Sequence, residues 1–462
     1  MTDSSMVGAP ATAVVAEPAW RSTRIALIQG ALISLAVVLG AGLLSALYTV
    51  PAIGAVLPSY GLQFTQLRPL HTVFAAAWMV LAGIAVVFWF FEREGKTRRP
   101  FDRFLCKLMV VSWAFAGAGI LITVPMGYVS GREYMGYHPI WSVPILLGWL
   151  AFATIFFRAT FKGFWDCPVY IMMWAVGSLF FVFTFAEQHL WLFDQIFADP
   201  IVDRRIQWMA TGTIVGAINL FVYGALYYAG DWLSGDDSFG RCGMGWALFG
   251  LGLLNSFVNF GHHTYHLPQS QLVHWISFVI NMTEVLVLFR VMGDLVGLAR
   301  EQRRGQVIPA KVCLVAAKWW TGILLIESIL LSIPPVNALL HGTWVVAGHA
   351  MTGMIGLDSM VLFGAVLVML SVDIDERGGI LERTNEAKLG LWIKGVNVSL
   401  FCFVSWFHIV GVLDGYFRYL TPPDIAYAMS RPVWLAQFAG VFCALFGSIL
   451  AVFMGGLVSR LL

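Results

Sequence analysis

The residues best suited to chemistry in this 462-residue chain are histidines that lie inside apolar segments or at their ends. Ionisable side chains are rare in such surroundings and are usually functional there. Histidines supplied by several separate segments predict a buried metal or haem site. The histidines placed in this way are His71, His189, His262, His263, His266, His341 and His349.

The stretch 341–351, HGTWVVAGHAM, carries two candidate axial ligands of haem. His349 and Met351 are two residues apart, which corresponds to about 200° around an α-helix. Their side chains therefore point to opposite sides, and one helix would offer a ligand to each of two haems. The alternative interpretation is a helix start with two polar residues and a methionine in the core.

The adjacent pair His262 and His263 and the isolated carboxylate Glu284 are further candidates. Two neighbouring imidazoles at a helix end can converge on one metal, and histidine ligands suit copper, zinc or non-haem iron. Tyr265 and His266 follow the pair and would support its ligands. Glu284 lies in FVINMTEVLVLF, where a charged group costs about 2.5–3.5 kcal/mol at the centre of a membrane helix. This cost favours a proton-handling or metal-facing role.

The elements that must position these residues are membrane-spanning helices. The chain is 59% hydrophobic and 12% charged, whereas soluble proteins contain about 25% charged residues. Twelve apolar runs are long enough to cross a hydrocarbon core of about 30 Å. They lie near residues 24–50, 70–91, 104–127, 140–160, 168–193, 206–229, 243–265, 270–297, 312–336, 342–372, 389–412 and 432–457.

We therefore expect an all-α polytopic membrane protein. Residues 1–20 are predicted to be a polar, disordered cytoplasmic tail, and residues 21–462 a single transmembrane domain. Lys and Arg concentrate in the loops 93–103, 300–311 and 377–388, which places both termini in the cytoplasm. This orientation brings the histidines to one layer near the periplasmic side. The net charge of +2 gives no indication of nucleic-acid binding.

Taken together, these motifs resemble the catalytic subunit, subunit I, of the haem–copper oxidase superfamily. LRPLHTVF (67–74) is similar to the second-helix motif of that family, which implies that His71 binds a low-spin haem. HGTWVVAGHAM is similar to its tenth-helix motif, which implies that His349 binds the high-spin haem. FGHHTYH resembles the pair that holds the non-haem metal, here His262 and His263. Met351 replaces the family's second low-spin ligand, and a His71/Met351 haem would have a raised potential.

Within the superfamily, the chain resembles the nitric oxide reductases more than the C-type oxygen reductases. The oxygen reductases place a tyrosine six residues before the histidine pair, where this chain has Ser256. The nitric oxide reductases keep a glutamate twenty-two residues after the pair, which is Glu284 here. The loop GREYMGY (131–137) also resembles their motif GREYLE, whose glutamates lie by the haem propionates and a calcium ion. Arg132 and Glu133 match this motif, whereas Gly136 replaces its second glutamate.

The third ligand of the non-haem metal is missing from its usual place. In both branches a histidine lies about fifty residues before the pair, where this chain has Gly212, and the reductase's second glutamate would fall on Gly216. HLWLFD (189–194) resembles the reductase motif only superficially. We hypothesise that His189, or Glu187 beside it, reaches the metal from the neighbouring helix. The rival hypothesis is that the site has lost this metal.

The resemblance implies a subunit of respiratory electron transport in the bacterial inner membrane that reduces nitric oxide to nitrous oxide, as in denitrification. It implies a low-spin and a high-spin haem of b type, a non-haem iron or copper, and the calcium site of the GREYLE loop. Electrons would come from a cytochrome c or copper-containing partner subunit, or from quinol. The alternatives are a terminal oxygen reductase and a haem electron-transfer or sensor protein with a degenerate metal site. A transporter would leave the histidines unexplained.

Overall fold

The computed structural model describes residues 18–161, 166–258, 265, 267–268, 270–301, 308–376, 383–422, 424–425 and 431–461. The predicted ligands His262 and His263, and the neighbouring His266, lie outside the described residues. Most of the predicted tail, residues 1–17, lies outside them as well, and the first helix begins at Pro18, three residues before the expected start of the domain.

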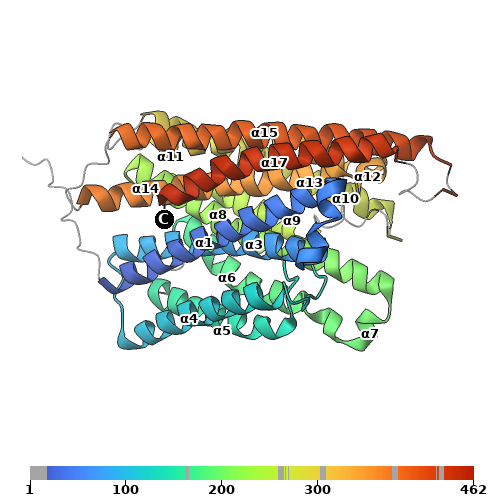
Figure 1. Cartoon of the computed structure of the whole chain (residues 1–462). Helices are drawn as coiled ribbons and strands as arrows, with labels where there is room; N and C mark the ends of the chain where they lie inside the picture. The colour runs from blue at the N-terminus through green and yellow to red at the C-terminus, as the bar shows by residue number, and fades with distance from the viewer. Residues whose placement is uncertain are drawn as a thin grey trace, which may run out of the picture.

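The described chain is a bundle of long helices (Figure 1). Eleven of its segments are long and apolar enough to cross a membrane, which confirms the predicted fold class. They are α1 (Pro18–Tyr48), α3 (Phe64–Arg93), α4 (Pro100–Thr123), α5 (Ser142–Thr160) with the short turn before it, α6 (Val169–Glu187) with the turn after it, α8 (Pro200–Ser234), α10 (Gln271–Glu301), α11 (Ile308–Ser332), the run that begins with α13 (Trp344–Met351), α15 (Arg383–Leu420) and α17 (Val433–Leu461).

The remaining predicted span, 243–265, contains the apolar helix α9 (Gly243–Val258), and residues 259–264 lie outside the described residues. Short helices connect the spans at the end of the bundle remote from the C-terminus (Figure 1). They are α2 (Pro51–Gly54), η1 (Leu57–Tyr60), η2 (Pro139–Trp141), η3 (Leu190–Leu192), α7 (Asp194–Phe197) and α12 (Pro334–Leu340).

The run that contains the predicted haem ligands changes its helical form in the middle of the bundle. α13 ends at Met351, the next segment η5 (Thr352–Ser359) is a π-helix, and α14 (Met360–Glu376) continues the span. A π-helical turn is rare and is frequently found at functional sites, because it re-aims side chains relative to a regular helix. Here it begins directly after the two candidate ligands.

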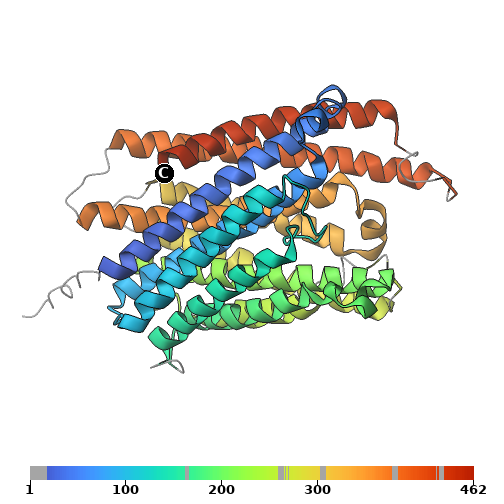
Figure 2. The same cartoon turned by 60° about the horizontal axis from the view of Figure 1, so that its bottom comes forward.

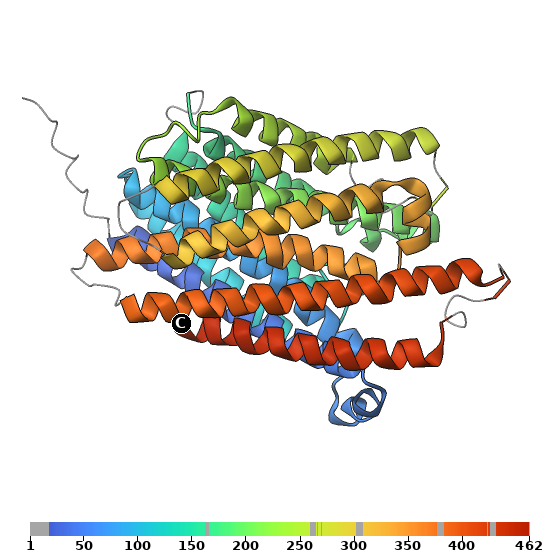
Figure 3. The ribbon, with the colours of Figure 1, turned by 90° about the horizontal axis from the view of Figure 1, so that it is seen from above.

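Two groups of helices create the interior that matters for function. In the first group α1 packs along α3 and α17, while α15 packs along α17 and α13. In the second group α8 packs against α6 and α9, and α9 packs against α10. Figures 2 and 3 show that α1 begins at the end of the bundle where α17 ends. That end is called the inner end below.

Local sequence signals determine where α8 begins and ends, and α8 carries the candidate positions Gly212 and Gly216. Asp199 caps its first turn, because its carboxylate accepts hydrogen bonds from the backbone N–H groups of Ile201 and Val202. Pro200 occupies the first helical position, where a missing N–H costs nothing. Gly235 ends the helix with a positive φ of 84°.

Candidate haem and metal sites

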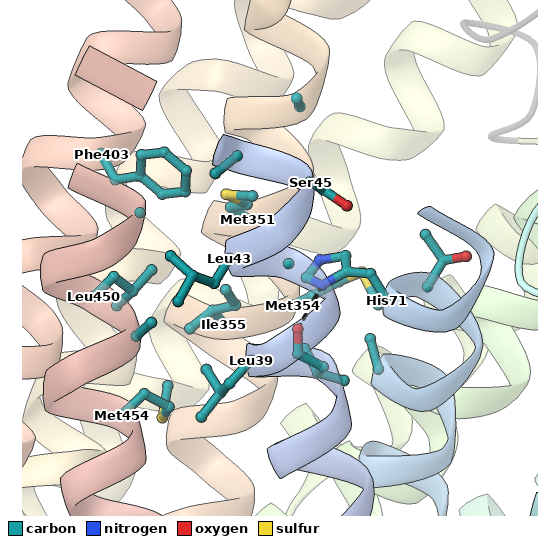
Figure 4. A pocket seen from close by; sticks show the side chains of 18 of the residues that line it. Leu39, Leu43, Ser45, His71, Met351, Met354, Ile355, Phe403, Leu450 and Met454 are labelled. Carbon is teal, nitrogen blue, oxygen red and sulfur yellow. Dashed lines mark hydrogen bonds between the residues drawn. The ribbon is translucent and has the colours of Figure 1, made fainter. Parts of the chain in front are cut away.

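A cavity of about 300 Å³ lies between α1, α3, α13, η5, α15 and α17. His71 and Met351, the two predicted ligands of the low-spin haem, both line it. Figure 4 shows His71 entering from one side and Met351 and Met354 from another, with leucine and phenylalanine side chains between the helices. Nearly all of its lining is apolar, apart from a few polar side chains that include Arg68 and Ser45. Such a cavity is chemically suited to a flat, apolar macrocycle.

The ring of His71 is fixed in one orientation. Its Nδ1 lies 3.0 Å from the carbonyl oxygen of Val38 in α1. A carbonyl only accepts hydrogen bonds, so Nδ1 carries the proton and Nε2 keeps the lone pair that an iron ion requires. The ring also lies directly against Gly42, where an added Cβ would be 2.7 Å from Nδ1. The close approach of α1 to α3 therefore depends on this glycine.

Two methionines, Met351 and Met354, line the cavity with His71, and either could supply the second haem ligand. Met354 in η5 is engaged, because the hydroxyl of Tyr134 donates a hydrogen bond to its Sδ at 3.4 Å. Burial raises the pKa of the Tyr134 phenol, so it stays a neutral donor. No hydrogen bond to Met351 is found among the described residues. Met351 is therefore the better candidate for the ligand.

Charged residues lie at one mouth of this cavity, close to the beginning of α3. Arg68 lines the cavity one helical turn before His71, and its Nη2 lies 2.6 Å from Glu133 Oε2. Glu133 thus lies next to Arg68, one of the residues that line the cavity. Arg132 does not line the cavity. Its Nη1 pairs with Asp203 at 2.8 Å and its guanidinium lies over the ring of Trp191.

Arg132, the predicted propionate partner, is thus paired with Asp203, while Arg68 is the arginine that lines the cavity. Sequence reasoning missed Arg68 although it stands inside the quoted motif LRPLHTVF. Position 136 has no room for a second calcium carboxylate, because a Cβ on Gly136 would be 2.7 Å from the Cβ of Pro69.

His349 faces away from this cavity, as the 200° separation from Met351 predicts. Its Nδ1 lies 3.3 Å from Glu327 Oε2 in α11. Histidines that bind metals usually donate their second ring N–H to a carboxylate, which fixes the tautomer and strengthens the ligand. Glu327 Oε1 also accepts a hydrogen bond from Thr352 at 2.9 Å and lies 3.3 Å from Nε2 of His408 in α15.

A second, small pocket of about 40 Å³ lies between α8, α9 and α10. Gly212, Gly216, Ser256 and Glu284 all line it, so the four positions that were compared with the oxygen and nitric oxide reductases lie together. The Glu284 carboxylate is buried and accepts hydrogen bonds from the Asn255 amide and from the Tyr223 hydroxyl, the latter at 3.5 Å. Tyr223 was not recognised from the sequence. A Cβ on Gly216 would collide with the Ser256 side chain.

The structure does not support His189 as a metal ligand. Its Nε2 lies 2.6 Å from the Ser142 hydroxyl and its Nδ1 lies 2.6 Å from the Phe185 carbonyl. Both ring nitrogens are thus used to join α5 to α6. Glu187 accepts a hydrogen bond from Thr213, the residue after Gly212, at 2.8 Å. Glu187, the alternative ligand in the hypothesis, therefore contacts α8 next to Gly212, and its partner there is the Thr213 hydroxyl.

A model of the family described as cytochrome c and quinol oxidase polypeptide I matches residues 23–453. The match spans nearly the whole chain. The chain belongs to the cytochrome c and quinol oxidase polypeptide I family. It is thus a haem–copper oxidase subunit I, an oxidoreductase of electron transport and a multi-pass membrane protein, as the motifs indicated.

Curated relatives of this oxidase-family chain are similar over about three quarters of its length. It is 24% identical over 382 residues to cytochrome c oxidase subunit 1 of Rhodobacter capsulatus, covering 77% of this chain and 68% of that protein. It is 25% identical over 380 residues to the Cbb3-type cytochrome c oxidase subunit CcoN1 of Stutzerimonas stutzeri, covering 76% and 75%. A solved haem–copper terminal oxidase dimer has the same fold, with a TM-score of 0.67 and 17% identity over 95% of this chain and 84% of that one.

Membership of this oxidase family implies haems and a metal site, and the described residues fit these groups unequally. The cavity that His71 and Met351 line suits one haem. His349, whose ring is hydrogen-bonded to the Glu327 carboxylate, suits the iron of a second. Among the described residues of the small pocket, Glu284 is the one side chain of a kind that commonly binds metal ions. No group of three His, Cys, Asp or Glu side chains that would hold a metal is found in the described parts of the chain. The haems therefore have candidate ligands among the described residues, whereas the second metal depends on residues outside them.

Proposed function

We propose that this haem–copper oxidase family chain is the catalytic subunit of a membrane enzyme that reduces nitric oxide. Two molecules of nitric oxide, two electrons and two protons would give one nitrous oxide and one water. The observation that carries this proposal is the pocket between α8, α9 and α10. It contains the carboxylate Glu284, while α9 contributes Ser256 where the oxygen reductases resembled here have a tyrosine.

The haems, when bound, would supply electron transfer and an iron that binds nitric oxide. The chain's own residues would do the remaining work. His71 and Met351 would hold one haem, and Gly42 would let α1 approach it. His349, braced by Glu327, would hold the other. Arg68, held by Glu133, would offer a positive charge to acidic groups at the mouth of the cavity.

Glu284 would hold the proton that the reaction consumes. Its two oxygens accept hydrogen bonds from Asn255 and Tyr223, and these partners fix the direction in which the carboxyl group faces. Because the pocket is small and buried, a proton on this group does not exchange freely with bulk water. General-acid groups placed in this way accelerate proton transfer by about 10²–10⁴-fold.

The enzyme would lie in the bacterial inner membrane, with both termini in the cytoplasm and the haem cavity toward the periplasm. The distribution of Lys and Arg in the loops supports this orientation. Electrons would come from a partner subunit that carries cytochrome c or copper, or from quinol. One relative is named as a subunit of a cbb3-type cytochrome c oxidase, which favours the cytochrome c partner.

Anaerobic turnover of the purified full-length protein tests this function. Reduced protein mixed with nitric oxide is expected to form nitrous oxide, measured by gas chromatography. Glu284→Gln is expected to lower that rate by about 100-fold while the optical spectrum of the haems stays unchanged. A parent protein with two haems that produces no nitrous oxide would contradict the proposal. Iron content in excess of haem would show whether the second metal is present, and its absence would favour an electron-transfer or sensor role.

Oxygen reduction is the second candidate function, and Tyr223 favours it. This tyrosine of α8 contributes a phenol to the same pocket, although no tyrosine comes from α9 at position 256. The named relatives are also oxidases. Oxygen consumption by the reduced parent, measured with an electrode, tests this candidate. A rate higher than that with nitric oxide, lost in Tyr223→Phe, would replace the first proposal by the second.

A further inference from the structure

A lysine within α11 takes no part in the haem cavity or in the small pocket. Lys318 stands in VAAKWWTGILL, ten residues after the helix begins at Ile308, which is about 15 Å along the helix axis. α11 is long and apolar enough to cross a membrane. A charged side chain in such a segment is costly, and it usually has a partner or a function. The surroundings of Lys318 therefore indicate what it binds.

Lys318 is half-buried where α11 packs against α10, the helix beside it (Figure 3). Its Nζ lies 6.0 Å from the ring centre of Phe289, and a Cβ on Gly293 would be 3.4 Å from the same atom. Trp319, next to Lys318 in the chain, is 73% exposed, and Phe289 is 38% exposed. We call these four residues the α10–α11 seam. Its two aromatic side chains show that the seam reaches the surface of the bundle, which faces lipid in a membrane protein.

The charge of Lys318 is not compensated by an acidic side chain of the described chain. Among the described residues, no carboxylate oxygen lies within 4.0 Å of its Nζ. Asp294, which follows Gly293, pairs instead with Nε of Arg290 at 3.2 Å. A ring centre at 6.0 Å is at the limit of the cation–π distance, and an exposed contact of this kind offsets only part of the cost of a lysine inside a membrane. Lys318 therefore requires an anion that the described chain does not supply.

Further cations lie between the seam and the inner end of the bundle. α10 ends and α11 begins at that end, because Glu301, the last residue of α10, lines the same cavity as Glu94 at the end of α3. Arg300 is exposed in the last turn of α10. Lys311 precedes Lys318 by seven residues, which places both on the same face of α11. Positive charge thus extends from the seam to the level at which lipid headgroups lie.

We propose that the α10–α11 seam binds the phosphate group of an anionic phospholipid, with Lys318 as its main contact. A lysine ammonium group pairs with phosphate as a compact charge, and basic sites between membrane helices bind lipid headgroups of this kind. An acyl chain of the lipid would lie against Phe289 and Trp319, whose side chains are exposed beside Lys318. The additional cations Arg300 and Lys311 at headgroup level favour a lipid over a single acidic side chain of another protein.

Native mass spectrometry of the full-length protein, titrated in detergent with phosphatidylglycerol or with zwitterionic phosphatidylcholine, tests the seam. The parent is expected to bind phosphatidylglycerol more tightly. Lys318→Met keeps an unbranched apolar side chain but removes the charge, so its affinity for phosphatidylglycerol is expected to fall at least about tenfold. Lys318→Arg keeps the charge and is expected to bind this lipid nearly as tightly as the parent. Parental optical spectra of the haems show that the variants have folded.

Lys107→Met provides a matched control. Lys107 is exposed on α4, seven residues after that helix begins, and α4 lies on the other side of the bundle from α11 (Figure 1). This variant is expected to bind phosphatidylglycerol as the parent does.

Four results would overturn the proposal. They are equal binding of the two lipids by the parent, parental affinity in Lys318→Met, an equal loss in Lys107→Met, and a membrane protein that copurifies with the parent but not with Lys318→Met. The last result would assign the anion to that protein. Because neither nitric oxide nor oxygen is turned over, the outcome does not depend on the proposed function.

Discussion

The proposed ligand pair of the low-spin haem, His71 and Met351, predicts a reduction potential that is directly measurable. Methionine opposite histidine raises the reduction potential of a haem above that of a bis-histidine haem. In Met351→His, a second imidazole would replace the thioether in the cavity that His71 lines. We expect the midpoint potential to fall on the order of 100 mV, within the roughly 0.8 V range that axial ligands set. An optical redox titration measures this shift.

Met354→Leu is the control for this variant. Met354 lines the same cavity, but its sulfur accepts the Tyr134 hydrogen bond. Its replacement is expected to leave the potential of the low-spin haem close to the parental value. A large shift in Met354→Leu together with an unchanged potential in Met351→His would assign the ligand to Met354 instead.

Glu327 is expected to tune the second haem through His349. In Glu327→Gln the carboxylate is lost, so the hydrogen bond from the histidine Nδ1 weakens and the imidazole becomes a poorer ligand. We expect a lower iron–histidine stretching frequency by resonance Raman spectroscopy and a loss of about 10–100-fold in activity. Thr352→Val removes only the hydroxyl donor to the same carboxylate. An equal frequency shift in both variants would contradict a specific role for the charge.

These residues also show which parts of the site a sequence can reveal. His71, His349 and Met351 are recognisable because each stands in a motif on one helix. Glu327 and His408 also stand in apolar runs, ILLIESILL and VSWFHIVG, and the argument that singled out Glu284 applies to them equally. Their roles depend on α11, α13 and α15 meeting at one point. Spacing within one helix carries no information about such a meeting.

At the scale of the helices, the contact between α1 and α3 depends on one missing side chain. In Gly42→Ala the new Cβ would lie 2.7 Å from Nδ1 of His71. The ring cannot yield without losing its hydrogen bond to Val38. We therefore expect the low-spin haem to be lost or displaced while the high-spin haem is retained, as measured by haem content and optical spectra.

Gly40→Ala provides a control on the same helix. Nothing lies within 4 Å of a Cβ at Gly40, and alanine favours helix more than glycine does. Normal haem content is therefore expected in this variant. A parental low-spin spectrum in Gly42→Ala would show that α1 can move away from α3 without cost to the haem.

The helices were easier to predict than their ends and their departures from regularity. Eleven predicted spans correspond to long apolar helices, because hydropathy alone reports them. α9 is described as far as Val258, and the following residues of its apolar run, 259–264, lie outside the described residues. The π-helical turn of η5 was not predicted, since no pattern in TGMIGLDS distinguishes it from a regular helix. The π-helical segment packs against α11 and α15, and these contacts between distant parts of the chain cannot be seen in its local sequence.

At the scale of the whole molecule, one buried arginine joins three distant parts of the chain at the inner end of the bundle. Arg24 of α1 is fully buried, and its Nη2 lies 3.0 Å from Glu92 of α3 and 2.8 Å from Asp373 of α14. The positive charge compensates two carboxylates that are themselves largely removed from solvent. Removing one member of such a cluster leaves a buried charge without its partner. This destabilises the protein more than replacing both partners by apolar side chains.

We therefore expect Arg24→Met to destabilise the protein by about 3–5 kcal/mol, measured by denaturant titration in detergent. The double variant Arg24→Met/Glu92→Met is expected to recover much of this loss, because both buried charges are then replaced by apolar side chains. Asp373 keeps a partner in either variant, since Arg21 lies 3.6 Å from it. If the single variant were as stable as the parent, the cluster would not hold α1, α3 and α14 together. If the double variant were less stable than the single one, Glu92 would have a stabilising role apart from Arg24.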